Sequence, residues 1–409
     1  MLVAADINFI ILEEHREVVT KSGACIMLWP NTTRVLDQMG LMDAAKRDDL
    51  ALHTKATMDY NGKETSSDPA FQWIKENHGY PAVTLPRPRL VKMLYEGLGG
   101  HMSKVKTSSS IQEIISNDEG VQVSLRDGTV YDGSIVIGCD GVHSRTRDIM
   151  QKEAEKTGTI LSEDQRITTF ECFYASASLP TPVATVGTFW ESHGPGRGTQ
   201  FMANGLKCHF GIFRRLADPV TSKHTYTEEE TRTFLQDTDD MWVAPGLQVK
   251  DLSQHITWRR LAYQAEGLLN RWYHHRIVLC GESVAHMASI NGMGYNAAFQ
   301  SAVYLANSLQ AVLKADPHPS VGILNKAFAD YQETRKPETK AISQVSFDYI
   351  RAVTWDSWPA RIFIEYFLPW FWGERGLSKR LGEIVSKGRK LDFIDHEDRV
   401  GIIPWTKTR

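Results

Sequence analysis

The stretch RIVLCGESVAHMASINGMGYNAAFQSA, residues 276–302, decides which fold the chain is expected to have. Its apolar run at 277–280 predicts a buried strand that ends at Gly281, and residues 291–296 (NGMGYN) predict a glycine-rich loop. From Ala297 onward apolar residues recur at helical spacing, which predicts a helix. A strand, a glycine-rich loop and a helix in this order present backbone N–H groups and a helix N-terminus to an anionic or polar ligand. An ordinary strand-to-helix turn has the same spacing, so the rest of the chain has to decide between them.

The composition is that of a globular protein large enough for two domains. Its 409 residues are 42% hydrophobic and 23% charged, and a net charge of -3 gives no reason to expect a nucleic acid as partner. The five cysteines have no CxxC spacing, which favours a reducing compartment and no metal site. Cys139 and Cys280 lie at the ends of apolar strands, where buried free thiols are expected. Residues 1–6 lack the pattern of a secretory signal, so an intracellular location is expected, either cytoplasmic or associated with a membrane.

The N-terminal residues contain one part of a nucleotide-binding unit without the part that normally precedes it. Residues 8–13 (NFIILE) predict an apolar strand that ends in Glu13. A carboxylate at the end of the second strand of such a unit accepts the ribose hydroxyls of an adenosine. The unit also needs an earlier strand and a GxGxxG turn, and only seven residues precede Asn8. Glu13 is therefore either a surface carboxylate or the ribose ligand of a fold that lacks its first strand and helix.

Three further segments carry candidate ligand groups. Arg87 precedes a predicted helix at 90–98, where an arginine either holds a phosphate or faces water. The apolar strand at 134–139 is closed by an Asp140–Gly141 turn that leads into a helix. Residues 168–216 predict several strands rich in aromatic residues. This separate antiparallel sheet either walls an apolar substrate pocket or forms an ordinary aromatic core.

Several motifs in one order together resemble the class A FAD-dependent monooxygenases. The apolar strand ending in Glu13, GCDGVHSRTR at 138–147 and GESVAHMASINGMGYN at 281–296 follow the order of that family. The opening at 22–41 (SGACIMLWPNTTRVLDQMGL) and the ending at 391–405 (LDFIDHEDRVGIIPW) are similar to one branch. That branch epoxidises or hydroxylates terpenoid, meroterpenoid and indole-diterpene intermediates of fungal secondary metabolism. The resemblance covers nearly the whole chain.

The resemblance implies an α/β fold with three parts. A Rossmann-like FAD-binding domain without its first strand and helix would occupy residues 1–165 and 263–335. An inserted antiparallel substrate-domain sheet would occupy 166–262, and a helical region would follow at 336–409. The implied cofactors are FAD and NADPH, and the implied partner is a lipophilic small-molecule substrate.

The resemblance also implies individual roles. The cofactor-binding residues would be Glu13 at the ribose, Met27 through its backbone, Arg87 at the phosphate-ribityl region, Asp140 between the FAD and nicotinamide sites, Glu282 at the ribityl chain, and Gly292, Gly294 and Tyr295 on the loop facing the isoalloxazine. Ser144 and Arg147 would support the Asp-Gly motif. His209 is the candidate catalytic residue, at a place where the branch often has a Tyr-Trp pair.

The chain departs from the family pattern, and this leaves a second function open. Besides the absent GxGxxG, the family's GDxxHxxxPxxGxGxN is altered here: Glu282 replaces Asp, Ala285 replaces His, Ser289 replaces Pro, and His286 stands one place late. The glycines and Asn296 are kept, so the shape of the loop is expected to be kept. The alternative is a flavin-free cyclase or isomerase, or an inactive remnant, with His209, Glu282 or His286 as candidate acids.

Aromatic residues also crowd residues 355–372. The stretch is too short and too interrupted by charges for a spanning helix of about 20 apolar residues. It predicts either a lid packed on the body or an interfacial helix that gives peripheral membrane contact or meets a greasy substrate.

Overall fold

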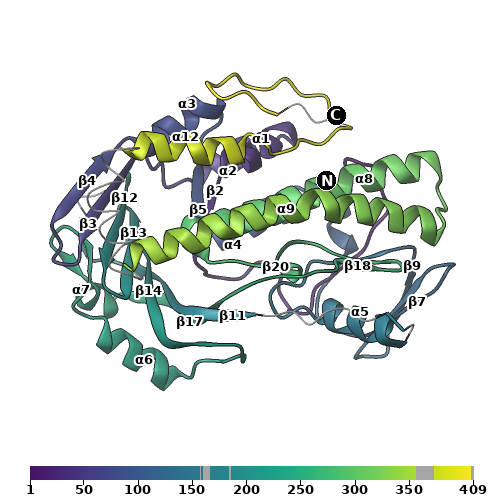
Figure 1. The fold of residues 1–409 in the computed structure, drawn as a ribbon, viewed down its shortest axis with the longest axis horizontal. Helices are drawn as coiled ribbons and strands as arrows, with labels where there is room; N and C mark the ends of the chain where they lie inside the picture. The colour runs from purple at the N-terminus through teal and green to yellow at the C-terminus, as the bar shows by residue number, and fades with distance from the viewer. Residues whose placement is uncertain (157, 160–165, 184–185, 356–372, 407–409) are drawn as a thin grey trace.

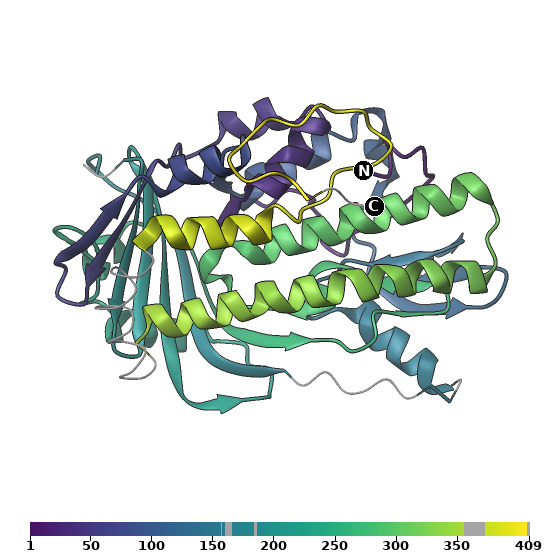
Figure 2. The same cartoon turned by 45° about the horizontal axis from the view of Figure 1, so that its top comes forward.

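The structure, a computed structural model, describes residues 1–156, 158–159, 166–183, 186–355 and 373–406. A large sheet lies at one end of the molecule and several short strands lie at the other (Figure 1). Two long helices, α8 (Met293–Ala315) and α9 (Val321–Val353), run side by side between these ends (Figure 2). The mixed arrangement confirms the predicted α/β fold class.

Two parallel strand pairs occur in small separate sheets. β1 (Ile11–Leu12) pairs with β6 (Val105–Lys106), and β10 (Val136–Gly138) pairs with β19 (Ile277–Leu279), whose other neighbour is the antiparallel β18 (Tyr273–His274). Within the described residues, β1 and β10 are each hydrogen-bonded to a strand on one side only. This is the arrangement expected of a Rossmann-like sheet without its first strand. The strand predicted at 8–13 is shorter than expected because its one partner, β6, offers only two residues.

The predicted antiparallel sheet is part of a larger, eight-stranded one. Its order is β20-β17-β11-β14-β13-β12-β3-β4. The strands are β3 (Thr54–Asp59), β4 (Glu64–Asp68), β11 (Ile167–Ser178), β12 (Thr188–Gly194), β13 (Arg197–Asn204), β14 (Lys207–Val220), β17 (Ile256–Leu268) and β20 (Ala285–His286). β3 pairs parallel with β12, and β20 pairs antiparallel with β17. The sheet thus includes β3 and β4 from the first part of the chain, and β20 from the altered motif at 281–296.

The remaining helices and strands cover and connect these sheets. They are β2 (Cys25–Leu28), α1 (Pro30–Gln38), α2 (Met42–Arg47), α3 (Ala70–His78), β5 (Val83–Pro86), α4 (Arg87–Glu96), η1 (Gly99–Lys104), β7 (Ile111–Ser116), β8 (Val121–Leu125), β9 (Val130–Gly133), α5 (Arg145–Lys156), α6 (Glu228–Asp237), β15 (Trp242–Ala244), β16 (Leu247–Gln248), α7 (Val249–Ser253), η2 (Gly281–Ser283), η3 (Ser289–Asn291) and α12 (Gly373–Val385). The predicted helix at 90–98 corresponds to α4. The Asp127–Gly128 turn connects the β8–β9 hairpin.

The aromatic residues of the large sheet are used both as core and as wall. The fully buried ones are Phe170, Phe173, Phe201 and Phe213. Phe189 instead borders the cavity described below. The two uses that the sequence left open therefore coexist in one sheet.

The glycine-rich loop is shorter than predicted, because α8 begins at Met293 rather than at Ala297. Gly292 precedes this helix with φ +65°, a conformation that L-residues with a side chain rarely adopt. A Cβ at Gly292 would lie 3.1 Å from the Cβ of Met27 in β2. A glycine is needed here because the loop turns sharply while lying directly against β2.

The C-terminal segment packs over α1 and α3 (Figure 2). Arg34 of α1 is nearly buried and donates from Nε and Nη2 to the two carboxylate oxygens of Asp398, at 2.7 and 2.6 Å. Its Nη1 also donates to the carbonyl oxygen of Gly388 at 3.0 Å. This fork-shaped pairing fastens the end of the chain to α1.

The aromatic stretch at 355–372 lies outside the described residues after Trp355, so its two interpretations stay predictions. Among the helices that the structure describes, none is long and apolar enough to cross a membrane.

Asp398→Ala is expected to lower the free energy of unfolding by about 3 kcal/mol, because it leaves the nearly buried Arg34 without its carboxylate. Urea unfolding of the purified protein measures this difference. Asp395→Ala is the matched control, since Asp395 is an exposed carboxylate of the same segment. Equal stability of the two variants would contradict a role for the Arg34 pairing.

Candidate active site

The residues predicted for the site border one cavity of about 4330 Å³. They are Glu13, Met27, Arg87, Asp140, His209, Glu282, Gly292, Gly294 and Tyr295. The cavity reaches from β1 and β10 to the aromatic face of the large sheet. Its volume is several times the roughly 300–1,000 Å³ of an ordinary small-molecule pocket, so a cofactor and a substrate fit together.

The side chain of Asn296 holds the glycine-rich loop in place. It is buried in the first turns of α8, and its Oδ1 accepts a hydrogen bond from the backbone N–H of Trp29 at 2.8 Å. Its Nδ2 donates to the carbonyl oxygens of Met27 at 2.9 Å and Gly292 at 2.8 Å. One amide therefore satisfies three backbone groups and connects β2 with the loop and with α8.

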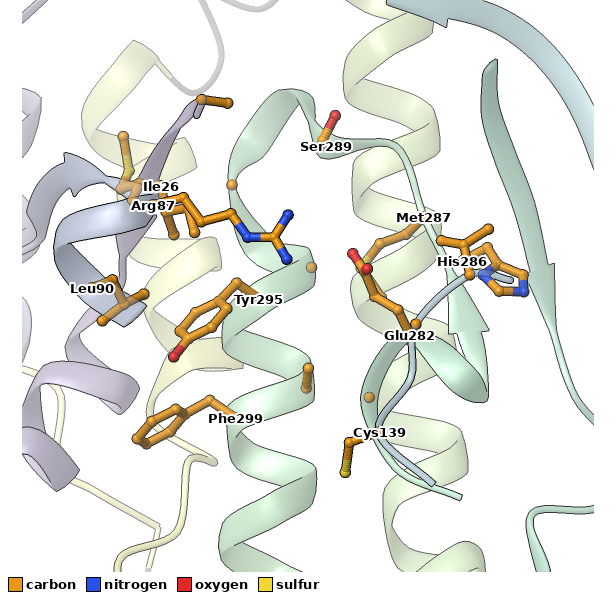
Figure 3. A pocket seen from close by; sticks show the side chains of 18 of the residues that line it. Ile26, Arg87, Leu90, Cys139, Glu282, His286, Met287, Ser289, Tyr295 and Phe299 are labelled. Atoms are coloured by element: carbon orange, nitrogen blue, oxygen red, sulfur yellow. The ribbon is translucent and has the colours of Figure 1, made fainter. Parts of the chain in front are cut away.

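Charged and polar side chains face each other across the cavity beside this loop. Arg87 at the start of α4 and Glu282 after β19 extend into the space from opposite sides, with Tyr295 of α8 nearby (Figure 3). Among the described residues, no carboxylate pairs with Arg87. Burial raises the pKa of Tyr295, and the charge of Arg87 opposes that shift. An arginine facing a cavity without a carboxylate partner suits an anionic ligand.

Asp140 is occupied by its own loop. Its carboxylate accepts hydrogen bonds from the hydroxyl of Ser144 and from the backbone N–H of Thr146, the latter at 2.8 Å. Both contacts lie at the start of α5, so Asp140 shapes the turn that carries Gly141.

Arg147 joins this turn to the neighbouring loop. Its guanidinium is 1% exposed and donates from Nη1 to the carbonyl oxygen of Ser283 at 3.1 Å, and from Nη2 to that of Val142 at 2.9 Å. The two loops that follow β10 and β19 are thereby held together at the edge of the cavity.

The replaced residues of the altered motif have contacts of their own. Ser289 donates from its N–H and its hydroxyl to Oε1 of Gln264 at 3.1 and 2.7 Å, and its hydroxyl also contacts that of Tyr174. These bonds fasten the loop to β17 and β11 where the family has a proline. His286 is buried in β20, and its ring points away from Glu282 (Figure 3).

His209 and Glu13 also have partners. Nδ1 of His209 lies 2.8 Å from the hydroxyl of Ser176, and burial, helped by the charge of Lys207, lowers the pKa of His209 to about 4. At neutral pH its ring is therefore uncharged, which favours hydrogen bonding over acid catalysis. Glu13 is partly exposed at the far end of the cavity, where it accepts a hydrogen bond from the N–H of His15 at 2.9 Å.

A buried ionic cluster was missed by sequence reasoning. The carboxylate of Glu191, in β12, has a side-chain exposure of 0% and lies 3.2 Å from Nζ of Lys55. It accepts hydrogen bonds from Nε2 of Gln200 at 2.7 Å and from the hydroxyl of Tyr349, while Nε2 of His193 lies 3.7 Å away. No local pattern signals this cluster, because its members are scattered along the chain and meet only after folding.

The cluster connects the large sheet with the glycine-rich loop. Nε2 of Gln200 also donates to the carbonyl oxygen of Ile290 at 2.6 Å. Burial alone would raise the pKa of Glu191, but the ammonium of Lys55 and the contacts with His193 and Tyr349 hold it below its usual value. Glu191 is therefore a carboxylate at neutral pH and forms one wall of the cavity.

Comparisons with known proteins agree with this geometry. Residues 1–345 match the family described as FAD binding domain. The chain is 32% identical over 421 residues to the FAD-dependent monooxygenase srdH of Neurospora crassa, with 98% of this chain and 94% of the relative covered. It is 28% identical over 410 residues to the FAD-dependent monooxygenase ausM of Penicillium brasilianum, with 98% and 85% covered.

Two solved structures share the fold. Klebsiella pneumoniae HpxO complexed with FAD and uric acid gives a TM-score of 0.75 at 17% identity, covering 94% of this chain and 92% of that one. CtdE in complex with FAD and substrate 4 gives a TM-score of 0.70 at 15% identity, covering 94% and 97%.

The Rossmann-like sheet, the second large sheet and the cavity, together with the family match, are those of a flavoprotein oxidoreductase. The chain belongs to the FAD-binding-domain family, and its relatives are fungal FAD-dependent monooxygenases. This confirms the resemblance to class A monooxygenases that the motifs indicated. It also confirms FAD as the cofactor of the family.

Asn296→Ala is expected to lower the free energy of unfolding by about 2–4 kcal/mol, because it leaves the N–H of Trp29 and the carbonyl oxygen of Met27 without this buried partner. Chemical unfolding of the purified protein measures the loss. Asn61→Ala, at an exposed turn, is the control and should change the value by less than about 0.5 kcal/mol. A loss no larger than that of the control would refute the anchoring role.

Glu191→Gln is expected to flatten the dependence of stability on pH. Because the folded pKa of Glu191 lies below the unfolded value of about 4.3, its ionised form stabilises the protein above that pH, and the contribution is lost as the pH falls towards the folded pKa. Urea unfolding between about pH 7 and pH 3 compares the two proteins. Parallel profiles would show that Glu191 has no lowered pKa.

Proposed function

We propose that the chain is an FAD-dependent monooxygenase that transfers one atom of O2 to an alkene or arene of a lipophilic terpenoid or meroterpenoid in secondary metabolism, with NADPH as the reductant. The single observation that carries this proposal is the continuous cavity, which joins the glycine-rich loop to the aromatic face of the large sheet. The fungal FAD-dependent monooxygenases among its relatives support the same reaction class.

The residues around the glycine-rich loop fit FAD. The N-terminus of α8 lies at the cavity, which Gly294 and Tyr295 line, and Arg87 adds a positive charge there. Glu282 offers a carboxylate that can accept hydrogen bonds from ribityl hydroxyls, and Glu13 stands at the opposite end for a ribose. The described residues contain no GxGxxG turn for the phosphates of FAD. We therefore assign the contacts with these phosphates to Arg87 and the α8 N-terminus.

When bound, FAD supplies the redox chemistry that activates O2 for transfer of one oxygen atom. The chain's own tasks are to bind, to orient and to exclude water. Gly292 lets the loop turn sharply while it lies against β2, and Asn296 holds it there, so the loop backbone is presented to the cavity in a fixed position. The α8 N-terminus beside it places positive partial charges where negative charge develops.

The opposite wall of the cavity indicates the class of substrate. Apolar and aromatic side chains from the large sheet line it: Phe189, Met202 and Trp258. This surface favours a lipophilic molecule and excludes water from it. Glu191 and Lys55 give the same wall one polar site, which suits an oxygen function on an otherwise apolar substrate.

The experiment that tests the function is absorbance of the purified protein followed by turnover. We expect the visible bands of bound flavin near one FAD per chain, and NADPH oxidation that a prenylated or terpenoid substrate accelerates with formation of an oxygenated product. A colourless protein that takes up no FAD would overturn the proposal. It would then favour the alternative of a flavin-free cyclase or isomerase, or of an inactive remnant.

Arg87→Ala is expected to raise the Kd for FAD by about tenfold or more, since a charged hydrogen bond contributes roughly 1.5–3 kcal/mol. Titration of the apoprotein with FAD, followed by flavin fluorescence, measures the change. Arg89→Ala is the matched control: Arg89 lies in the same helix but forms an ion pair with Asp48 at 3.0 Å. Equal affinities of both variants would place the phosphates of FAD elsewhere.

A further inference from the structure

Two of the five cysteines lie next to each other at the edge of the cavity. Cys139 directly follows β10 and Cys280 directly follows β19, two strands that pair in parallel register through Gly138 and Leu279. The backbone N–H of Cys280 donates to the carbonyl oxygen of Gly138 at 2.9 Å, so the register continues to the two cysteines. Both residues line the cavity.

The prediction that both thiols are buried is wrong for Cys139. Cys280 is 3% exposed, whereas Cys139 is exposed. The physical reason is that β10 has no described strand on its other side, so the residue that follows it borders the open cavity (Figure 3).

The two thiols lie close enough together for each to shift the pKa of the other. The proximity of Cys280 raises the pKa of Cys139, and the proximity of Cys139 lowers the pKa of Cys280. The hydroxyl of Tyr331 also lowers the pKa of Cys280. Loss of one proton from the pair therefore leaves a thiolate directly beside a thiol, which is the arrangement that thiol oxidation to a disulfide requires.

We propose that Cys139 and Cys280 form a reversible disulfide when hydrogen peroxide enters the cavity. Neighbouring residues of paired strands lie within the Cα separation of about 4.4–6.8 Å that disulfides tolerate. The bond would connect the two loops that carry Asp140 and Glu282, which face the FAD region. The pair is thus a redox-sensitive modification site at the ends of β10 and β19, beside the proposed FAD site.

The chemistry balances with peroxide as the oxidant. The thiolate attacks one peroxide oxygen, an S–O bond forms as the O–O bond breaks, and protonation of the leaving oxygen gives water and a sulfenic acid. The second sulfur then displaces the sulfenic oxygen as a second water, and the S–S bond forms. Two thiols lose two electrons and peroxide is reduced to two waters. The cellular source of peroxide rests on the proposed function, because a flavin monooxygenase releases it when O2 is reduced without transfer to the substrate.

The test uses the full chain and added peroxide, so it does not depend on bound FAD. The reduced, folded protein is treated with hydrogen peroxide, quenched, unfolded and alkylated with N-ethylmaleimide. We expect intact mass to show the loss of two of the five alkylatable thiols. We also expect a non-reducing digest to contain a Cys139–Cys280 cross-linked peptide, and dithiothreitol to restore all five thiols.

Three variants separate this site from general oxidation. Cys139→Ser and Cys280→Ser should each abolish the cross-link, whereas Cys25→Ser should leave it unchanged. Cys25 is a matched control because it also lines the cavity but pairs with Pro86 in β5. Retention of all five thiols in wild type, or a cross-link between other cysteines, would overturn the proposal. A cross-link in a protein that binds no FAD would refute the proposed function alone.

Discussion

The side-chain amide of Asn296 is the contact on which the arrangement of the site depends. It donates to or accepts from three backbone groups, two on β2 and its continuation and one on the glycine-rich loop. Such groups are costly to bury without partners, so the amide fixes how close the loop comes to β2. The 3.1 Å separation that a Cβ on Gly292 would have from Met27 is a consequence of this closeness.

Two more buried side chains complete the frame from other directions. Arg147 connects the loops after β10 and β19, and Gln200 connects Glu191 in the large sheet with the carbonyl oxygen of Ile290. Each uses a polar side chain to join backbone segments that share no secondary structure. The segment from Gly281 to Asn296 is therefore held by β2, by the short parallel sheet and by the eight-stranded sheet together.

Within this frame, the replaced residues of the motif make contacts of their own. Ser289 makes hydrogen bonds to Gln264 and Tyr174, so the loop has a connection to the large sheet where the family's proline is missing. His286 is taken up by β20, where it is buried and paired in the sheet instead of facing Glu282. The changes alter the set of groups offered to a ligand. Glu282 still supplies a carboxylate to the cavity, as the family's Asp would, whereas Ala285 and Ser289 stand where the family has its His and Pro.

The sequence by itself determined the fold class, the family and the strand–loop–helix unit around Gly292, because hydrophobic periodicity and glycine positions act over short distances along the chain. It also identified Arg87, Glu282 and Tyr295, which the structure brings to one cavity. It could not locate the start of α8 at Met293, because loop glycines hide the first turn of a helix. Only the tertiary structure decided that Glu191 meets Lys55 and that Cys139 meets Cys280 at an open edge. Those pairings depend on strand register and on which strand edges remain uncovered, and neither is encoded in the spacing of residues along the chain.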